Sequence, residues 1–328
     1  TGRRAAGMAS TGGPRPSEIL TPKALRNAAA VLHAIGGSTN GLVHLAAIAG
    51  RVKQPLDYDA FDRLGREVPV LANVKPSGAH YMQHFHEAGG LPRLLREIAS
   101  SLATDARTVS GGTIADEIAA ADEVPGQDVI RTRSNPVASE GALAILRGNL
   151  APRGAVIKQS AASKKLMRHT GRAIVFDSVE DLARRVDDPA LDVAPDDVLV
   201  LRNAGPKGAP GMPEAGYLPI PKKLLKQGVT DMVRISDARM SGTAFGTVVL
   251  HVAPESAAGG PLALVRTGDR IRLDVPERRL ELLVDDAELG SRAGPAPLRE
   301  PSRGYARLFQ QHITQADEGC DFDFLVER

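Results

Sequence analysis

Apolar residues recur at helical spacing in the first part of the chain. Thr21 can cap a helix whose first turn suits Pro22, and Gly36 and Gly37 end the pattern. A second periodic stretch begins at "STN", residues 38–40, which can cap the next helix. The sequence therefore predicts two consecutive helices. Their apolar positions are Leu25, Ala28, Val31, Leu32 and Ile35 in the first and Leu42, Leu45, Ala46 and Ala49 in the second.

The next apolar run, "VPVLANV" at residues 68–74, is short and rich in valine, which is typical of a strand. A polar helix is predicted from about His80 to Ala88, closed by Gly89 and Gly90. Alternation of strands with helices favours an α/β architecture for this first third of the chain.

After an irregular polar stretch between Thr113 and Pro136, the pattern changes to short β-branched runs separated by turn residues. Many short strands with few helices between them favour a closed or sandwiched sheet. We therefore predict two domains, residues 1–135 and 136–328. The predicted strands are 154–158, 173–176, 197–202, 232–236 and 247–252, followed by 269–275 and 279–284 as a hairpin around residues 276–278.

Charge and composition argue against several classes of function. Lys and Arg number 41 against 39 Asp and Glu, a net charge of +2 with the signs interspersed, which indicates neither nucleic acid nor membrane surface as a partner. Residues 27–50 carry no acidic or basic side chain apart from histidine, but "GGSTN" interrupts them, so we expect no membrane span. The start of the chain shows no apolar signal core, and the single cysteine, Cys320, fits a reducing compartment. These features predict a cytoplasmic protein.

The loop "GPKGAPGMPE", residues 205–214, combines glycine and proline at high density and ends on one carboxylate. Glycine permits unusual backbone angles and proline removes conformational freedom, so such a loop can hold Glu214 in one position. A carboxylate in this position can bind Mg²⁺, act as a general base or simply face solvent.

The segment "RISDARMSGTAFG", residues 234–246, follows an apolar strand with an unusual density of polar groups. Gly242 allows a substrate to approach the Ser241 hydroxyl closely. No Gly-x-Ser-x-Gly motif surrounds Ser241, which disfavours a hydrolase, and helix capping by Ser241 or Thr243 is the structural alternative. His80 and His84 lie one helical turn apart and could share a metal, but without a third ligand at zinc spacing we expect capping or core hydrogen bonds.

Together these stretches resemble the dihydroxy-acid dehydratase and sugar-acid dehydratase family, over about residues 14–325. The longest shared motifs are "AIGGSTNGLVHLAAIAGR", "LRGNLAPRGAVIK", "LRNAGPKGAPGMPE" and "RISDARMSGTAFGTVVLHVAPESAAGGPLALV". Within the family, "ISDARMSGTAFG" is more similar to the aldonate (arabinonate or xylonate) branch than to the branch of branched-chain amino-acid synthesis.

The resemblance implies a hydro-lyase that removes water from a sugar acid to give a 2-keto-3-deoxy acid. In the family, Mg²⁺ neutralises developing charge and an iron–sulfur cluster, [2Fe–2S] or [4Fe–4S], assists the departing hydroxyl. The family's magnesium glutamate corresponds to Glu214 and its catalytic base to Ser241, with Thr243 as an assisting hydroxyl. The implied partners are a small sugar acid and further copies of the chain in a homodimer or homotetramer.

The resemblance also implies that this chain is a fragment. In the family, the cluster cysteines and the remaining magnesium ligands precede the matching region, and Cys320 stands where alanine is usual, so it is not assigned as a cluster ligand. The implied fold is the end of an N-terminal α/β domain followed by a C-terminal β-barrel-like domain of the aconitase swivelling type, inactive alone. The alternatives are a dihydroxy-acid dehydratase of branched-chain amino-acid synthesis and a non-catalytic folded module.

Overall fold

The computed structural model describes residues 2–242, 244–292, 294 and 301–326 of the 328-residue chain. Its internal contacts divide it into two compact units. One unit comprises Thr1–Gly37 and Ile48–Ala142, and the other comprises Ser38–Ala47 and Leu143–Arg328. None of the helices among the described residues has the length and apolar character needed to cross a bilayer.

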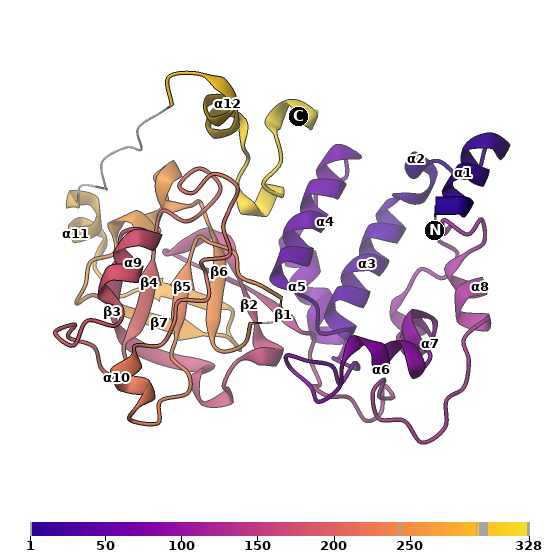
Figure 1. Cartoon of the computed structure of the whole chain (residues 1–328), viewed down its shortest axis with the longest axis horizontal. Coiled ribbons are helices and arrows are strands. Elements are labelled where there is room, and N and C mark those ends of the chain that lie inside the picture. Colours follow the sequence, from indigo (N-terminus) through magenta and orange to yellow (C-terminus); the bar gives the residue numbers. More distant parts are fainter. Residues whose placement is uncertain (1, 243, 293, 295–300, 327–328) are drawn as a thin grey trace. The chain divides into compact units, whose positions relative to one another are not determined.

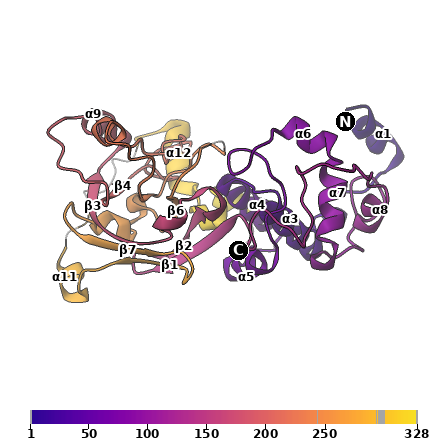
Figure 2. The ribbon, with the colours of Figure 1, turned by 90° about the horizontal axis from the view of Figure 1, so that it is seen from below.

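The first unit is helical, and Figures 1 and 2 show its helices from two directions. Both helices predicted near the start of the chain are present, and Thr21 Oγ1 accepts a hydrogen bond from Ala24 N at 3.3 Å as an N-cap. The elements are α1 (Gly2–Thr11), α2 (Pro16–Ile19), α3 (Pro22–Ala34), α5 (Tyr58–Glu67), α6 (Met82–Glu87), α7 (Gly90–Glu97) and α8 (Ile114–Ala119). The helix α4 (Thr39–Arg51) runs from the second unit into the first.

The strand predicted over residues 68–74 is wrong. The segment is buried, but it forms only isolated bridges, Val70 with Ala138, Ala72 with Ile130 and Val74 with His80. The partner changes from Ala138 to Ile130 and then to His80 along the segment, so no continuous ladder forms. Among the described residues of this unit, the helices therefore pack around extended chain rather than around a sheet.

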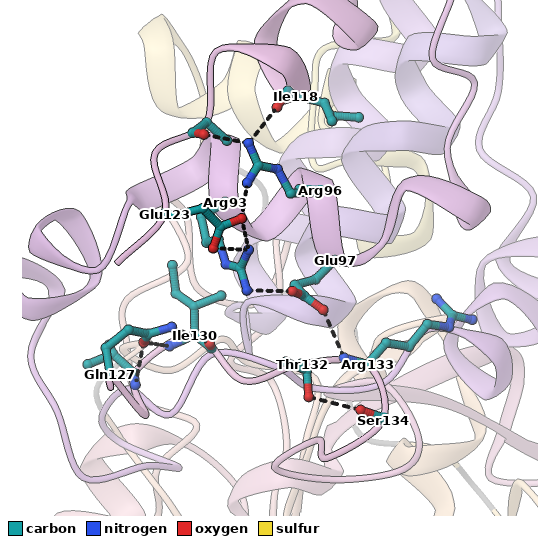
Figure 3. Close-up of polar contacts among 12 residues, drawn as sticks. Arg93, Arg96, Glu97, Ile118, Glu123, Gln127, Ile130, Thr132, Arg133 and Ser134 are labelled. Atoms are coloured by element: carbon teal, nitrogen blue, oxygen red, sulfur yellow. Dashed lines mark hydrogen bonds and ion pairs between the residues drawn. The ribbon is translucent and has the colours of Figure 1, made fainter. Parts of the chain in front are cut away.

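A network of ion pairs fixes the segment after α8 to α7 (Figure 3). Arg93 Nη2 lies 2.7 Å from Glu97 Oε1, and Arg96 Nη1 lies 2.5 Å from Glu123 Oε1. Glu97 Oε2 accepts a hydrogen bond from the main-chain N–H of Arg133 at 3.0 Å. The side chains of Arg93 and Glu97 are only 13% and 14% exposed, so this pair is less screened than an ordinary surface pair.

The second unit is a closed barrel with the strand order β1-β2-β6-β5-β4-β3-β7-β8. The sequence predicted a closed or sandwiched sheet, and the sheet is closed. The predicted β7–β8 hairpin is confirmed, while β1 was not predicted. Strands β3 to β6 are parallel neighbours and the remaining neighbours along β1-β2-β6 and β3-β7-β8 are antiparallel. The strands are β1 (Leu143–Gly148), β2 (Ala151–Lys158), β3 (Arg168–Phe176), β4 (Val198–Leu201), β5 (Arg234–Ser236), β6 (Val248–Ala253), β7 (Arg270–Asp274) and β8 (Arg279–Leu282).

The barrel interior is filled by alternate residues of every strand, such as Ala155 and Ile157 of β2 and Val249 of β6. A second apolar cluster, containing Phe176 and Leu201, packs outside β3 and β4 under the helices that follow them. The helices of this unit are α9 (Val179–Arg185), α10 (Lys222–Leu225), α11 (Asp286–Ser291) and α12 (Gly304–His312).

The barrel closes between β1 and β8 through few main-chain contacts. Arg147 N donates to Arg278 O at 2.9 Å, and the Asn149 side chain continues the ladder. Asn149 Nδ2 donates to Leu282 O at 2.9 Å, and Leu282 N donates to Asn149 Oδ1 at 2.8 Å. A Cβ on Gly148 would lie 2.0 Å from Leu280 O, so only glycine allows the two strands to approach here.

Candidate active site

The loop 205–214 follows β4, and two buried carboxylates hold the main chain of the loop and of the two residues before it. Asp237 accepts hydrogen bonds from Ala204 N at 2.9 Å and Asn203 N at 3.2 Å. Glu255 accepts from Lys207 N at 2.9 Å and from Gly208 N at 3.0 Å. Hydrogen bonds from main-chain amides to two acids far away in the sequence therefore hold the loop in place.

Both acids are almost fully buried, with Asp237 0% and Glu255 1% exposed. Burial raises the pKa of Asp237 and of Glu255, although the amide donors oppose that shift by stabilising the charged forms. Gln315 completes the surroundings of Glu255, because its Nε2 donates to the carboxylate at 2.7 Å and its Oε1 accepts from Glu255 N at 2.8 Å.

Arg239 joins the end of this loop to the segment that carries Ser241. Its Nε donates to Met212 O at 2.6 Å, and its carbonyl accepts from Gly216 N at 2.8 Å. Glu214 lies midway between Met212 and Gly216, and Ser241 lies two residues after Arg239. Two residues span at most about 7 Å, so the Cα atoms of Glu214 and Ser241 each lie within about 7 Å of the Cα of a residue in this contact.

The site residues predicted from the resemblance differ in exposure. Glu214 is exposed and Ser241 is half-buried. Thr243 lies outside the described residues. Asn40 Nδ2 donates to Met240 O at 3.0 Å, and a Cβ on Gly242 would lie 3.2 Å from Ser38 Cβ, so the start of α4 packs against the Ser241 segment.

His251 is a buried residue of this region that the sequence analysis did not single out. It is 2% exposed, has a φ of 54°, and its Nε2 lies 3.2 Å from Thr39 Oγ1. Burial, together with the charge of Arg239 and the neighbouring His44, lowers the pKa of His251 to about 3. The imidazole is therefore neutral, and its buried Nδ1 has no hydrogen-bonding partner among the described residues.

The described residues do not by themselves make up a metal centre. They contain no group of three or more His, Cys, Asp and Glu side chains placed to hold an ion. Cys320 contacts Met212 Sδ through its Sγ at 3.1 Å, and burial raises the pKa of its thiol to about 12, so the sulfur is not a thiolate. His80 pairs with Asp128 at 2.9 Å, and His84 Nδ1 accepts from Tyr81 N at 3.3 Å, as the capping interpretation predicted.

Asp237 lies in the polar segment 234–246 that also contains Ser241, but the loop-holding role of Asp237 and Glu255 was not predicted. The only available signal is that an acid follows an apolar strand, directly in "RISD" and after one proline in "VAPE".

Comparison with known proteins gives matches over almost the whole chain. Residues 1–117 match the model described as dihydroxy-acid/6-phosphogluconate dehydratase N-terminal, and residues 128–320 match its C-terminal counterpart. The chain is 51% identical over 330 residues to an L-arabinonate dehydratase of Rhizobium leguminosarum bv. trifolii, covering 99% of this chain and 56% of that protein. It is 54% identical over 316 residues to a 6-deoxy-6-sulfo-D-gluconate dehydratase of Pseudomonas putida, covering 95% and 54%.

A dihydroxy-acid dehydratase of Ignicoccus hospitalis is 41% identical over 332 residues, covering 99% of this chain and 58% of that protein. The chain thus spans a little over half the length of the curated relatives it matches.

Proposed function

Because the chain belongs to the dihydroxy-acid/6-phosphogluconate dehydratase family, we propose that it forms part of the active site of a sugar-acid dehydratase. In this reaction the proton on C2 and the hydroxyl on C3 leave as water, and the resulting enol becomes a 2-keto-3-deoxy acid. The relatives named for sugar acids, at 51% and 54% identity, support this substrate class over the branched-chain dihydroxy acids, whose named relative is 41% identical.

Ser241 is the proposed base that takes the C2 proton, with Thr243 as an assisting hydroxyl. A serine hydroxyl becomes a base only when nearby positive charge or a second base lowers its pKa. The observation that carries the assignment is the pair of Arg239 hydrogen bonds to Met212 and Gly216, which bring the Glu214 loop beside the Ser241 segment.

Glu214 is proposed as one magnesium ligand. One exposed carboxylate is not a complete magnesium site, and the single thiol of Cys320 is not a complete ligand set for an iron–sulfur cluster, which takes several cysteines. The remaining donors for both groups would come from outside the described residues, and we assign no step to either group. A homodimeric or homotetrameric assembly in the cytoplasm belongs to the same proposal.

The test uses the full-length dehydratase that contains this chain, purified with its cofactors. Formation of 2-keto-3-deoxy acid is measured from L-arabinonate, D-xylonate, D-galactonate and 6-deoxy-6-sulfo-D-gluconate, with 2,3-dihydroxyisovalerate as the competing substrate. Ser241→Ala should lower kcat by about 10²- to 10⁴-fold, the usual contribution of a general base. Glu214→Gln should lower activity and magnesium affinity together.

Glu277→Gln is the matched control, because Glu277 is an exposed acid in the β7–β8 turn. It should leave both kcat and magnesium affinity unchanged. Full activity in Ser241→Ala would exclude Ser241 as the base. A preference for 2,3-dihydroxyisovalerate over every sugar acid would exclude the proposed substrate class.

A further inference from the structure

Lys158 is the last residue of β2, and its side chain is buried. It is 3% exposed, although lysine is almost never fully buried unless it is paired. No hydrogen bond or ion pair joins its ammonium group to another described residue. Its position therefore lacks the partner that a buried charge ordinarily has.

Strand alternation places Lys158 on the outer face of the barrel. Ala155 and Ile157 belong to the interior cluster, so Val156 and Lys158 face the opposite way. The neighbouring strand is β6, which runs antiparallel to β2. Val156 of β2 pairs with Leu250 of β6, and Ile157 pairs with Val249, so the same register places Lys158 beside Val248.

This outer face is covered by the segment that carries Ser241. Met240 and Ala244, which flank Ser241, pack against Val248 and Leu250 of β6. The turn after Lys158 is also bonded to the end of the same segment, because Gly246 N donates to Ala161 O at 2.9 Å. The Lys158 side chain therefore leaves β2 on the outer face that the Ser241 segment covers.

The charge balance at this position is unusual. Burial alone lowers the pKa of Lys158 to about 8, with no opposing contribution from a nearby acid. The side chain still carries a proton for most of the time at neutral pH. The Lys158 side chain is buried over most of its length and its ammonium group has no counter-ion among the described residues, so an anion that entered the site would supply the missing charge.

We propose that Lys158 binds the carboxylate of the sugar-acid substrate at the Ser241 site. This inference rests on the proposed function, which supplies a substrate with one carboxylate next to the carbon that loses its proton. The ammonium would donate to a carboxylate oxygen, and this contact would hold C2 close to Ser241.

The test compares three variants in the full-length dehydratase. Lys158→Met keeps an unbranched apolar side chain and removes the charge, and Lys158→Arg keeps the charge. Lys165→Met is the matched control, since Lys165 is exposed and lies seven residues further along the chain. KM and kcat are measured with the best sugar acid, and the thermal midpoint of each protein is measured with and without that acid.

Lys158→Met should raise KM by at least about 30-fold, with a smaller change in kcat, because it removes one partner of a buried charge pair. Lys158→Arg should restore part of the affinity. The same Lys158→Met change should raise the midpoint of the ligand-free protein by about 2–4 °C, since it removes a buried unpaired charge, and should abolish the further rise caused by the sugar acid.

A KM within twofold of the Lys165→Met control would overturn the inference while leaving the proposed function intact. A lowered midpoint of ligand-free Lys158→Met, with unchanged KM, would show a structural role instead. Should the methionine variant not fold, Lys158→Gln replaces it with the same expected change in KM. A wild-type enzyme that dehydrates no sugar acid refutes the proposed function first and this inference with it.

Discussion

Gly205 lies in the loop that carries Glu214, and replacing it by alanine should displace this loop from Glu255. A Cβ on Gly205 would lie 2.6 Å from Glu255 Oε2 and 2.9 Å from Glu255 Cβ, both well inside ordinary contact distance. The Glu255 side chain cannot simply move aside, because it is buried and its carboxylate accepts hydrogen bonds from Lys207 N, Gly208 N and Gln315 Nε2.

The cost follows from those three hydrogen bonds. Each bond to a charged acceptor contributes about 1.5–3 kcal/mol, and relaxation of the loop would recover part of the loss. We expect Gly205→Ala to lower the free energy of unfolding by about 3 kcal/mol. Gly211→Ala is the control in the same loop. Gly211 has a φ of 85° and open space around its Cβ position, so the substitution should cost only about 1 kcal/mol of backbone strain.

Urea unfolding followed by circular dichroism measures both values in parallel. The activity of the full-length enzyme should fall further with Gly205→Ala than with Gly211→Ala, because the first change shifts the anchor of the Glu214 loop. A loss for Gly205→Ala of less than 1 kcal/mol, or one no larger than that of Gly211→Ala, would refute the role assigned to Glu255.

Two other buried groups give further predictions. The pKa of His251 is about 3 in the folded protein and about 6.5 in the unfolded chain, so the unfolded chain alone takes up a proton as the pH falls through this window. Between pH 6 and 4 the free energy of unfolding should therefore fall by up to about 1.4 kcal/mol per pH unit because of His251. Asparagine tolerates the positive φ, and His251→Asn should remove this part of the fall. The free energies come from urea unfolding at each pH, and an equal pH dependence in both proteins would contradict the prediction. Arg234 is 1% exposed and donates to Asp231 Oδ1 at 2.8 Å and Tyr217 O at 2.9 Å. Arg234→Met should lower the free energy of unfolding by about 3–5 kcal/mol, and adding Asp231→Asn should cost less than its effect alone; strict additivity in thermal unfolding would argue against a coupled pair.

The strands of the barrel were predictable where β-branched residues run together, as in β3, β4 and β6. The first strand, "LAILRG", was missed because alanine and leucine favour helices and only one residue of the run is β-branched. The opposite error occurred at Val68–Val74, where the composition favours a strand but the partners lie in separate segments and leave only isolated bridges. Pairing partners, which lie far away in the sequence, decide these cases.

The candidate active site, like the barrel strands, was predictable only in part. Glu214 and Ser241 came from motif resemblance, and their catalytic roles stay predictions. Asp237 and Glu255 act on main-chain amides that lie more than thirty residues away, and such contacts leave no spacing pattern in the sequence. Lys158 was part of a quoted motif, but its burial follows only from the barrel register.

Gly148 and Asn149 belong to the motif "LRGNLAPRGAVIK", and they complete the ring between β1 and β8. A larger residue at 148 would leave both strands as open edges with unpaired main-chain groups, which can pair with other molecules. Damage to this motif would therefore be recognised by aggregation of the protein during expression, before any change in chemistry could be measured.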